Sequence, residues 1–275
     1  HHLADAKALE ANGIIAKGER LYAEVHTAEA EREYLAAQKT AATLNSALCN
    51  TLNAETTYQP ISSMFILSQI EDVDHFKQLA LNNNPQLRQV GLKKDLAVEG
   101  VRLQRADFAP QVALMGGASF YNYQVTPLMP RWAVGAGVSF KIFDGLNREY
   151  KFSAAKSQVR QVEALNVKAQ HDILTLIDKL YNEMTTYNEQ LPSIDAAYNF
   201  AAEYLRIKEE AFKEGAAPSS DVVDAQLNLA KIKTERLQAA YYYDLMLARL
   251  LEACGESEML TEYARRPAAM PIRYE

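Results

Sequence analysis

Apolar residues recur along this sequence with two different periods. Between Leu21 and Leu48 the apolar positions are mostly three, four or seven residues apart, which is typical of a helix with one apolar face. This pattern is interrupted near Asn12-Gly13. We therefore expect residues 1–55 to form helix on both sides of a turn.

The next stretch, residues 56–84, is less regular and is expected to connect helical segments, with a short helix from Asp72 to Leu81. Asn84 and Pro85 indicate a new helix start, because asparagine is a good N-cap and proline fits the first helical position. The helical period then continues to Pro110. The sequence thus predicts another helix within residues 85–110.

The period changes to two in residues 131–143, where apolar residues alternate with small or polar ones, as in a β-strand. The apolar face consists of Trp132, Val134, Ala136, Val138, Phe140 and Ile142. Residues 111–123 alternate less sharply, and residues 124–130 contain two prolines that indicate a loop. These features predict a β-hairpin within residues 111–143.

The pattern leaves two environments open for this hairpin. Each predicted strand has about the 9 to 11 residues that a tilted membrane-spanning strand needs. A soluble two-stranded sheet packed on a helix would show the same alternation. Because a lone hairpin is only marginally stable, its strands are expected to join a larger sheet.

The segment 144–255 has the pattern of two long helices separated by a break at Gly215–Ser220. Helices of roughly 60 and 35 residues would be about 90 and 50 Å long at 1.5 Å per residue. Such lengths favour a coiled-coil-like hairpin. Residues 256–275 are expected to form a peripheral tail. The predicted fold is mainly α, with long antiparallel helical hairpins and one β-hairpin.

The sequence also contains an internal repeat. A shift of 202 positions places Asn12-Gly13 on Glu214-Gly215 and brings the helices that follow into the same apolar phase. Because the break, the helix start and the apolar phase all coincide, we infer a duplication. The first copy begins close to its turn. We therefore expect the complete protein to extend upstream, with a second β-hairpin and another long helix.

Composition and the absence of known motifs argue against several classes of function. The formal charge of −6 argues against a nucleic-acid partner, which requires a basic surface. Cys49 and Cys254 lie in apolar helical contexts and are expected to be buried thiols. The sequence has no His-Glu-x-x-His, Cys-x-x-Cys, Gly-x-Ser-x-Gly or glycine-rich phosphate loop. It therefore predicts no enzymatic activity, no cofactor and no metal site.

The order of these elements resembles the TolC family of outer-membrane efflux and secretion channels, over about residues 3–255. Asn84-Pro85-Gln86-Leu87 is similar to the family's opening of its second half, and Phe108–Val112 is similar to its entry into a strand. Gly137–Gly145 looks like the strand exit. The turns that begin at Gly13 and Gly215 resemble the family's two periplasmic tip turns.

This resemblance implies a fold and a function. Three protomers would share one transmembrane β-barrel, with the apolar face of Trp132–Ile142 against outer-membrane lipid, and would continue it as an α-helical barrel in the periplasm. Such a homotrimer exports small molecules or proteins in a tripartite efflux or type I secretion system, with a periplasmic adaptor and an inner-membrane pump. It catalyses no reaction. The alternative is a soluble periplasmic helical-hairpin adaptor or scaffold protein.

The resemblance also suggests functional residues at the tip. Asp221 and Asp224 share one face of a helix N-terminus, where acids also complement the helix dipole and Ser219 or Ser220 is a possible cap. In the family, equivalent acids form a carboxylate ring at the periplasmic aperture. Glu19 matches the acid of the family's latch.

Two further positions of the latch differ. Phe212 and Ala217 stand where the family has a tyrosine and an arginine, so closure is expected to depend on packing or on other pairs. The resemblance implies that the tip turns contact the adaptor, whereas a simple helix–helix connection is the alternative. The residues concerned are Gly13, Ile14, Ile15, Gly215, Ala216 and Pro218.

Overall fold

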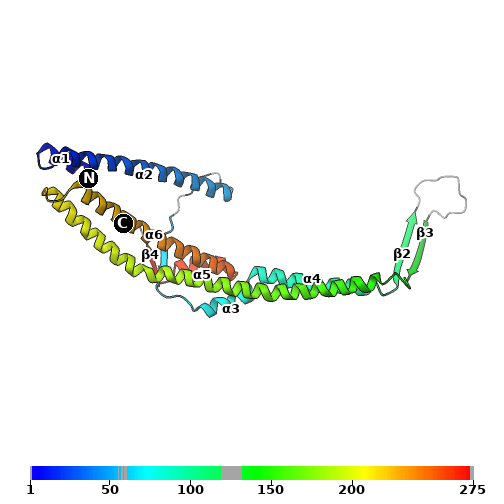
Figure 1. The fold of residues 1–275 in the computed structure, drawn as a ribbon. Helices are drawn as coiled ribbons and strands as arrows, with labels where there is room; N and C mark the ends of the chain where they lie inside the picture. Colours follow the sequence, from blue (N-terminus) through cyan, green and yellow to red (C-terminus); the bar gives the residue numbers. More distant parts are fainter. Residues whose placement is uncertain (1, 55, 57, 59–60, 119–131, 273–275) are drawn as a thin grey trace, which may run out of the picture. The chain divides into compact units, whose positions relative to one another are not determined.

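The computed structural model describes residues 2–54, 56, 58, 61–118 and 132–272 (Figure 1). The chain divides into two compact units. The first unit comprises residues 1–72, 179–251 and 257–275, and the second comprises residues 73–178 and 252–256. The helix α5 (Asn147–Lys213) supplies residues to both units.

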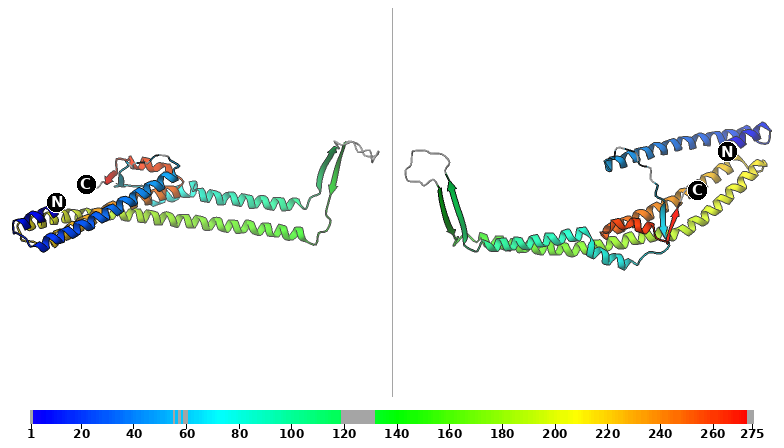
Figure 2. Two further views of the ribbon diagram at one scale, coloured as in Figure 1. Left: turned by 90° about the horizontal axis from the view of Figure 1, so that it is seen from above. Right: turned by 180° about the vertical axis from the view of Figure 1, so that it is seen from behind.

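Two helical hairpins form most of the first unit (Figures 1 and 2). The helices α1 (His2–Ala11) and α2 (Lys17–Thr51) form one hairpin. The last part of α5 and the helix α6 (Ser219–Ala253) form the other. The predicted breaks near Gly13 and at Gly215–Ser220 therefore fall between helices.

The two hairpins repeat each other at the offset found in the sequence. The helices α1 and α5 end 202 residues apart, and α2 and α6 are both 35 residues long and also start 202 residues apart. Gly13 and Gly215 share a φ of +71°. After the second helix, Asn53 and Gly255 again have positive φ at the same offset. The backbone geometry thus confirms the inferred repeat.

A small apolar core, the tip core, joins the turn ends of the two hairpins. Its buried members come one from each of α1, α2, α5 and α6, and they are Ala6, Ala23, Phe212 and Val222. The side chains of Leu3, Leu9, Ile15 and Leu205 are partly buried against it. Because each of the four helices contributes a side chain, this core holds the two turns next to each other.

The long helices leave many large apolar side chains in solvent. The helix α5 has 67 residues and continues through Pro192. Leu35 of α2 is 56% exposed, and Leu96 of α4 (Pro85–Ala106) is 73% exposed. None of the described helices combines the length and the apolar character needed to cross a membrane.

A two-stranded antiparallel sheet completes the first unit. The strand β1 (Met64–Leu67) pairs with β4 (Ala269–Ile272), so that Leu67 lies opposite Ala269. The short helices η1 (Ser257–Met259) and α7 (Leu260–Ala264) precede β4. Phe65, Ile66, Leu67 and Ile272 are buried. Residues 256–275 therefore contribute a strand and buried side chains, which the expectation of a peripheral tail missed.

Local pattern does not reveal this sheet. The run Met64–Leu67 is continuously apolar, and such a short run is compatible with helix as well as strand. The strand β4 contains Pro271, which normally argues against a strand. Because each strand of a two-stranded sheet is an edge strand, a proline is tolerated there.

Asp244 of α6 connects that helix to the sheet. Its Oδ2 accepts a hydrogen bond from the Phe65 N–H at 3.2 Å. Its Oδ1 has no hydrogen-bond partner within the described part of the chain. Burial raises the pKa of Asp244 to about 7, although the hydrogen bond from Phe65 favours the charged form.

The second unit contains α3 (Val73–Asn83), α4, the first part of α5, and two strands. Asn84 caps α4, because its Oδ1 accepts the Leu87 N–H at 2.9 Å. Its Nδ2 also donates to the Ala253 carbonyl oxygen at 2.7 Å. The predicted N-cap and the proline at the first helical position are thus confirmed.

Both cysteines are buried free thiols, as predicted. In the second unit the Cys254 thiol donates to the Phe76 carbonyl oxygen at 3.4 Å. Burial raises the pKa of Cys254 to about 12, which disfavours the nucleophilic thiolate. The structure therefore supports a packing role for this residue.

The strands β2 (Gln111–Ala118) and β3 (Trp132–Ser139) form the predicted antiparallel hairpin. Gln111 lies opposite Ser139, and Ala118 lies opposite Trp132. This register places most of the large apolar side chains of both strands on one face, which consists of Trp132, Val134, Ala136, Val138, Val112, Leu114, Gly116 and Ala118. Met115 lies on the other face. The predicted loop 124–130 and the predicted end of the first strand lie outside the described residues.

The prediction for the end of the second strand was wrong. Phe140 and Ile142 were expected in the strand, but β3 ends at Ser139. Ser139 pairs with Gln111, which follows Pro110. Because proline has no N–H, the preceding chain does not extend the ladder. Ile142 is 85% exposed and lies beyond the sheet.

The buried carboxyl of Asp244 gives a prediction for stability against pH. Its folded pKa of about 7 exceeds the ordinary value of 3.8, so the folded protein binds this proton more tightly than the unfolded chain does. The contribution to stability is therefore present at low pH and is lost as the pH rises through about 7. Asp244→Asn should weaken the pH dependence between about pH 4 and 7 and raise stability at pH 8. Urea unfolding followed by circular dichroism measures both effects, with the exposed Asp95→Asn as control. An unchanged pH dependence in Asp244→Asn would contradict this assignment.

Candidate functional site

The turns after α1 and α5 have the same hydrogen-bonded geometry. In each, a glycine at φ +71° and the residue after it donate to carbonyl oxygens of the last helical turn. These bonds join Gly13 to Glu10 and Ile14 to Leu9, at 2.9 Å each, and Gly215 to Phe212 and Ala216 to Ala211, at 3.0 and 2.8 Å. This arrangement is a Schellman motif, which satisfies carbonyls at a helix end and favours glycine at the left-handed position.

The two turns also touch each other. A Cβ atom added to Gly215 would lie 3.2 Å from Cγ2 of Ile14, so glycine permits this close approach as well as the positive φ. Ile15 is partly buried against the tip core. The other five predicted contact residues are exposed, and they are Gly13, Ile14, Gly215, Ala216 and Pro218. The sequence-predicted tip residues thus lie at one end of the first unit, and Ile15 also serves in packing.

Glu19 connects the two hairpins. Its Oε2 accepts the backbone N–H of Ser219 at 2.6 Å, across 200 positions of sequence. Ser219 is the first residue of α6 and is completely buried. A carboxylate at this position satisfies a free N–H of the helix and complements the helix dipole. The structure therefore places Glu19 at the N-terminus of α6, where it acts as a cap supplied from the other hairpin.

His2 occupies the other side of Ser219. Its Nε2 lies 2.7 Å from the Ser219 Oγ, and its ring lies 4.8 Å from that of Phe212. Burial lowers the pKa of His2 below its ordinary value of 6.5, which the nearby carboxylates of Asp5 and Glu209 partly offset. The Ser219 side chain is thus engaged with α1.

The two predicted aperture acids have different surroundings. The Lys208 ammonium donates to Asp221 Oδ2 at 2.6 Å, and this hydrogen bond raises the pKa of Lys208. Asp224 is exposed and forms no ion pair with any described residue. Asp221 therefore also joins α5 to α6, while the charge of Asp224 is open to solvent.

Phe212 and Ala217 occupy the two positions at which the resemblance leads one to expect polar residues of a latch. Phe212 is 1% exposed and belongs to the tip core, so it contributes packing. Ala217 is partly exposed and carries no polar group. Glu19, Asp221 and the His2–Ser219 contact are among the polar contacts between helices in this region.

Sequence reasoning missed Lys208, and it named Ser219 only as a possible cap of its own helix and not as a contact of Glu19 and His2. Lys208 precedes Gly215 by seven residues, and Asp221 follows it by six. Antiparallel helices place residues at such similar distances from the turn opposite each other. The spacing around the turn was therefore a usable signal for the Lys208–Asp221 pair. The position of Glu19 next to Ser219 depends on how the two hairpins pack, and the sequence gives no comparable indication of it.

The β-hairpin is exposed on both faces. Val134, Val138 and Trp132 of β3 are 75%, 71% and 71% exposed. Leu114 of β2, on the same face, is 82% exposed. The opposite face carries mostly small or polar residues such as Gly137 and Ser139, together with Met115. In the described residues β2 and β3 form a sheet of their own, so each strand has one unpaired edge.

No group of three or more histidine, cysteine, aspartate or glutamate side chains in the described ranges is arranged to hold a metal ion. The polar groups at the tip instead form ties between helices. The arrangement is suited to holding two hairpins together and to presenting carboxylates.

A family model described as "Outer membrane efflux protein" matches residues 77–256, which is more than half of the chain. The outer membrane protein TolC of Vibrio cholerae is 24% identical over 173 residues, which are 62% of this chain and 39% of the relative. Thus the chain spans well under half the length of that relative.

Solved structures of outer-membrane proteins share the fold. VceC of Vibrio cholerae is similar with a TM-score of 0.73 and 18% identity, over 90% of this chain and 61% of VceC. The open state of the outer-membrane channel MtrE of Neisseria gonorrhoeae is similar with a TM-score of 0.73 and 17% identity, over 93% of this chain and 61% of MtrE. The long helical hairpins and the β-hairpin of this chain therefore follow a known channel architecture.

Removing the cap at Glu19 should loosen the start of α6. In Glu19→Ala the Ser219 N–H loses its acceptor, and a lost N-cap typically costs about 1 kcal/mol. We expect amide hydrogen exchange in residues 219–222 to accelerate by about fivefold. Glu24→Ala is a matched control, because Glu24 pairs with Arg20 on the same helix. Equal exchange rates in residues 219–222 of both variants would show that Glu19 does not cap α6.

Proposed function

This chain belongs to the outer membrane efflux protein family, and we propose that it is part of one protomer of a trimeric outer-membrane channel. The channel would export small molecules or proteins in a tripartite efflux or type I secretion system. It would act with a periplasmic adaptor and an inner-membrane pump. Its place would be the Gram-negative outer membrane and the periplasm, and its role is transport without catalysis.

The observation that carries this proposal is the exposed β-hairpin. Burying a large apolar side chain contributes about 1.5 to 3 kcal/mol, and the apolar face of β2 and β3 exposes several of them. Both strands also have an unpaired edge, which is costly in lipid unless further strands close the sheet. A barrel shared with other protomers, with its apolar face against lipid, would satisfy both requirements.

The alternative is a soluble adaptor or scaffold. That role requires the apolar face of the hairpin to pack on a helix or on another sheet. In the described residues the side chains of Val134 and Leu114 remain exposed, and β2 pairs with β3 alone. The family match and the channel-like fold also favour the channel over the scaffold.

The tip residues support two further parts of the proposal. Threefold symmetry would turn Asp224 and Asp221 into a carboxylate ring at the periplasmic aperture, with Glu19 beside it. The exposed turn residues would contact the helical tip of the adaptor, and they are Gly13, Ile14, Gly215, Ala216 and Pro218. Ile15 would support this surface from below through the tip core.

A charge on the lipid face should block assembly, whereas the same charge on the opposite face should not. Arginine near the middle of the membrane costs about 2 to 4 kcal/mol on the lipid face of a barrel. In the complete gene product we expect Leu114→Arg, in the middle of β2, to reduce strongly the amount of trimer in outer-membrane fractions. Ala113→Arg, one residue earlier on the other face, is the matched control. A wild-type protein that is monomeric and stays in solution without detergent would overturn the channel proposal.

The proposed aperture ring predicts an effect on ion selectivity. Asp224→Asn is the cleaner variant, because Asp221 also pairs with Lys208. We expect Asp224→Asn to reduce the ratio of potassium to chloride permeability about twofold, measured as the reversal potential in planar bilayers. Asp224→Glu keeps the charge and should keep the ratio. If Asp224→Asn conducts with the wild-type ratio, Asp224 does not line the aperture.

A further inference from the structure

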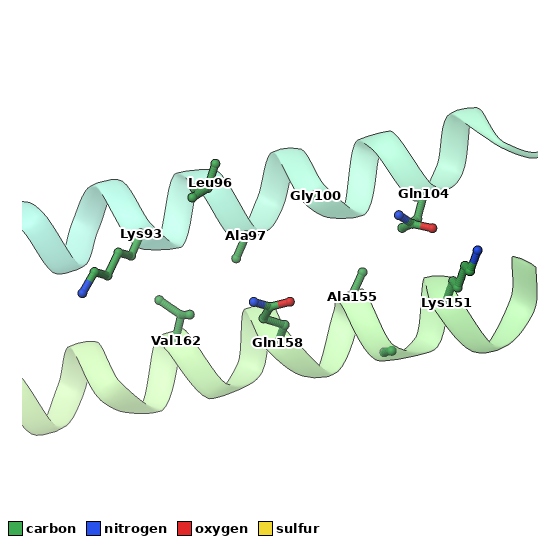
Figure 3. A pocket seen from close by; sticks show the side chains of 10 residues that line it. Lys93, Leu96, Ala97, Gly100, Gln104, Lys151, Ala155, Gln158 and Val162 are labelled. Atoms are coloured by element: carbon green, nitrogen blue, oxygen red, sulfur yellow. The ribbon is translucent and has the colours of Figure 1, made fainter.

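The helices α4 and α5 leave a groove between them in the second unit (Figure 3). The groove measures about 710 Å³, within the range of typical ligand sites. It exists because small residues face each other across the helix pair, among them Ala97, Gly100 and Ala155. Lys93 of α4 and Lys151 of α5 line it toward opposite ends (Figure 3).

A second groove of about 450 Å³ follows the same helix pair. It shares no lining residue with the first, and its cationic members are Arg102, Lys156 and Arg160. Because a helix turns by about 100° per residue, the α4 residues lining the two grooves point about 140° apart. For the α5 residues that line the two grooves, the corresponding angle is the same to within a few tens of degrees. The grooves therefore lie on opposite sides of the line of contact between the two helices.

Both grooves are cationic, although the chain as a whole carries a formal charge of −6. The ten residues that line the first groove and the seven that line the second include no aspartate or glutamate. Among the nearby carboxylates, Glu163 pairs with Lys94 at 3.3 Å and Glu99 pairs with Arg102. Lys93 and Lys151 form no ion pair with any residue that the structure describes.

The second groove keeps its positive charge despite local contacts. Lys156 lies over the Phe152 ring at 4.3 Å, a contact that leaves the ammonium charged. Arg160 donates to the Ser157 hydroxyl at 3.0 Å. Arg102 is paired with Glu99, so Lys156 and Arg160 supply the net charge of this groove.

From this arrangement we propose that the α4–α5 pair forms an anion-attracting section of the channel wall, which favours anionic solutes as cargo. The inference rests on the proposed channel function. In a tunnel wall built from this helix pair, one groove faces the lumen and the other faces outward. Because no carboxylate lines either groove, the groove that faces the lumen presents cations there in either orientation.

Assembly strengthens this effect. Threefold symmetry repeats each lumenal cation as a ring of three, the arrangement by which lysine and arginine select anions in pores. Clefts lined by one sign of charge and bounded by protein also concentrate the field and raise the local concentration of counter-ions. The apolar side chains of Leu96 and Val162 next to Lys93 provide contact area for the uncharged part of an organic anion.

The test is the reversal potential of single channels formed by the complete protein in a potassium chloride gradient. All variants also carry Asp224→Asn, so that the cation preference of the proposed aperture ring does not hide the effect of the α4–α5 cations on the permeability ratio. Two double variants remove the cations of one groove each, namely Lys93→Gln with Lys151→Gln, and Lys156→Gln with Arg160→Gln. We expect one of the two to lower the ratio of chloride to potassium permeability by about twofold or more, because only one groove faces the lumen.

Charge-conserving variants separate charge from packing. Lys93→Arg with Lys151→Arg, and Lys156→Arg with Arg160→Lys, should keep the ratio of the background channel. If a double glutamine variant forms no channels, the corresponding single variants give the same comparison with half the charge change. Open channels whose permeability ratio is unchanged by both glutamine pairs would overturn this inference and leave the channel function standing. A complete protein that forms no channels at all would overturn the proposed function and this inference with it.

Discussion

The reversal of the chain at two left-handed glycines is the constraint on which the rest of the first unit depends. Gly13 and Gly215 adopt the same φ and close the same pair of hydrogen bonds. Each turn makes the two helices that flank it antiparallel neighbours. Only then do residues on opposite sides of a turn meet, as Lys208 and Asp221 do at 2.6 Å.

The contact between the turns extends this constraint from one hairpin to two. Gly215 admits the side chain of Ile14, and the tip core takes one buried side chain from each of the four helices. This packing places the Glu19 carboxylate against the first N–H of α6. A helix end and an acid from different copies of the repeat therefore depend on each other. Opening the tip therefore requires breaking the hydrogen bond between the Ser219 N–H and the Glu19 carboxylate, and also separating the side chains of the tip core.

The second unit differs from the first, because it exposes apolar surfaces and strand edges that its own chain does not cover. The strands β2 and β3 present an apolar face and two unpaired edges, and α4 exposes leucines along its length. Between α4 and α5, alanine and glycine keep the helices close but leave grooves at their sides. Lysine and arginine line these grooves, and no aspartate or glutamate is among the lining residues. The exposed apolar surfaces, the strand edges and the cationic grooves of this unit are thus suited to contacts with molecules outside the single chain.

Much of this architecture follows from sequence alone. The helical periods, the change to period two, the Asn84-Pro85 helix start and the 202-residue repeat all express local backbone preferences, which operate between residues close in the chain. The family resemblance came from the order of these same local features. The end of β3 was misplaced, because alternation continues past the point where Pro110 stops the ladder.

Other features depended on the tertiary structure, because they join residues far apart in the chain. The β1–β4 sheet pairs Met64 with Ile272, and Glu19 reaches Ser219 across 200 positions. The raised pKa of Asp244 arises from burial next to a strand whose existence the local pattern does not show. The cationic grooves require α4 and α5 to lie side by side in a particular rotation. Periodicity specifies which face of a helix is apolar, but only packing determines which residue of another segment meets it.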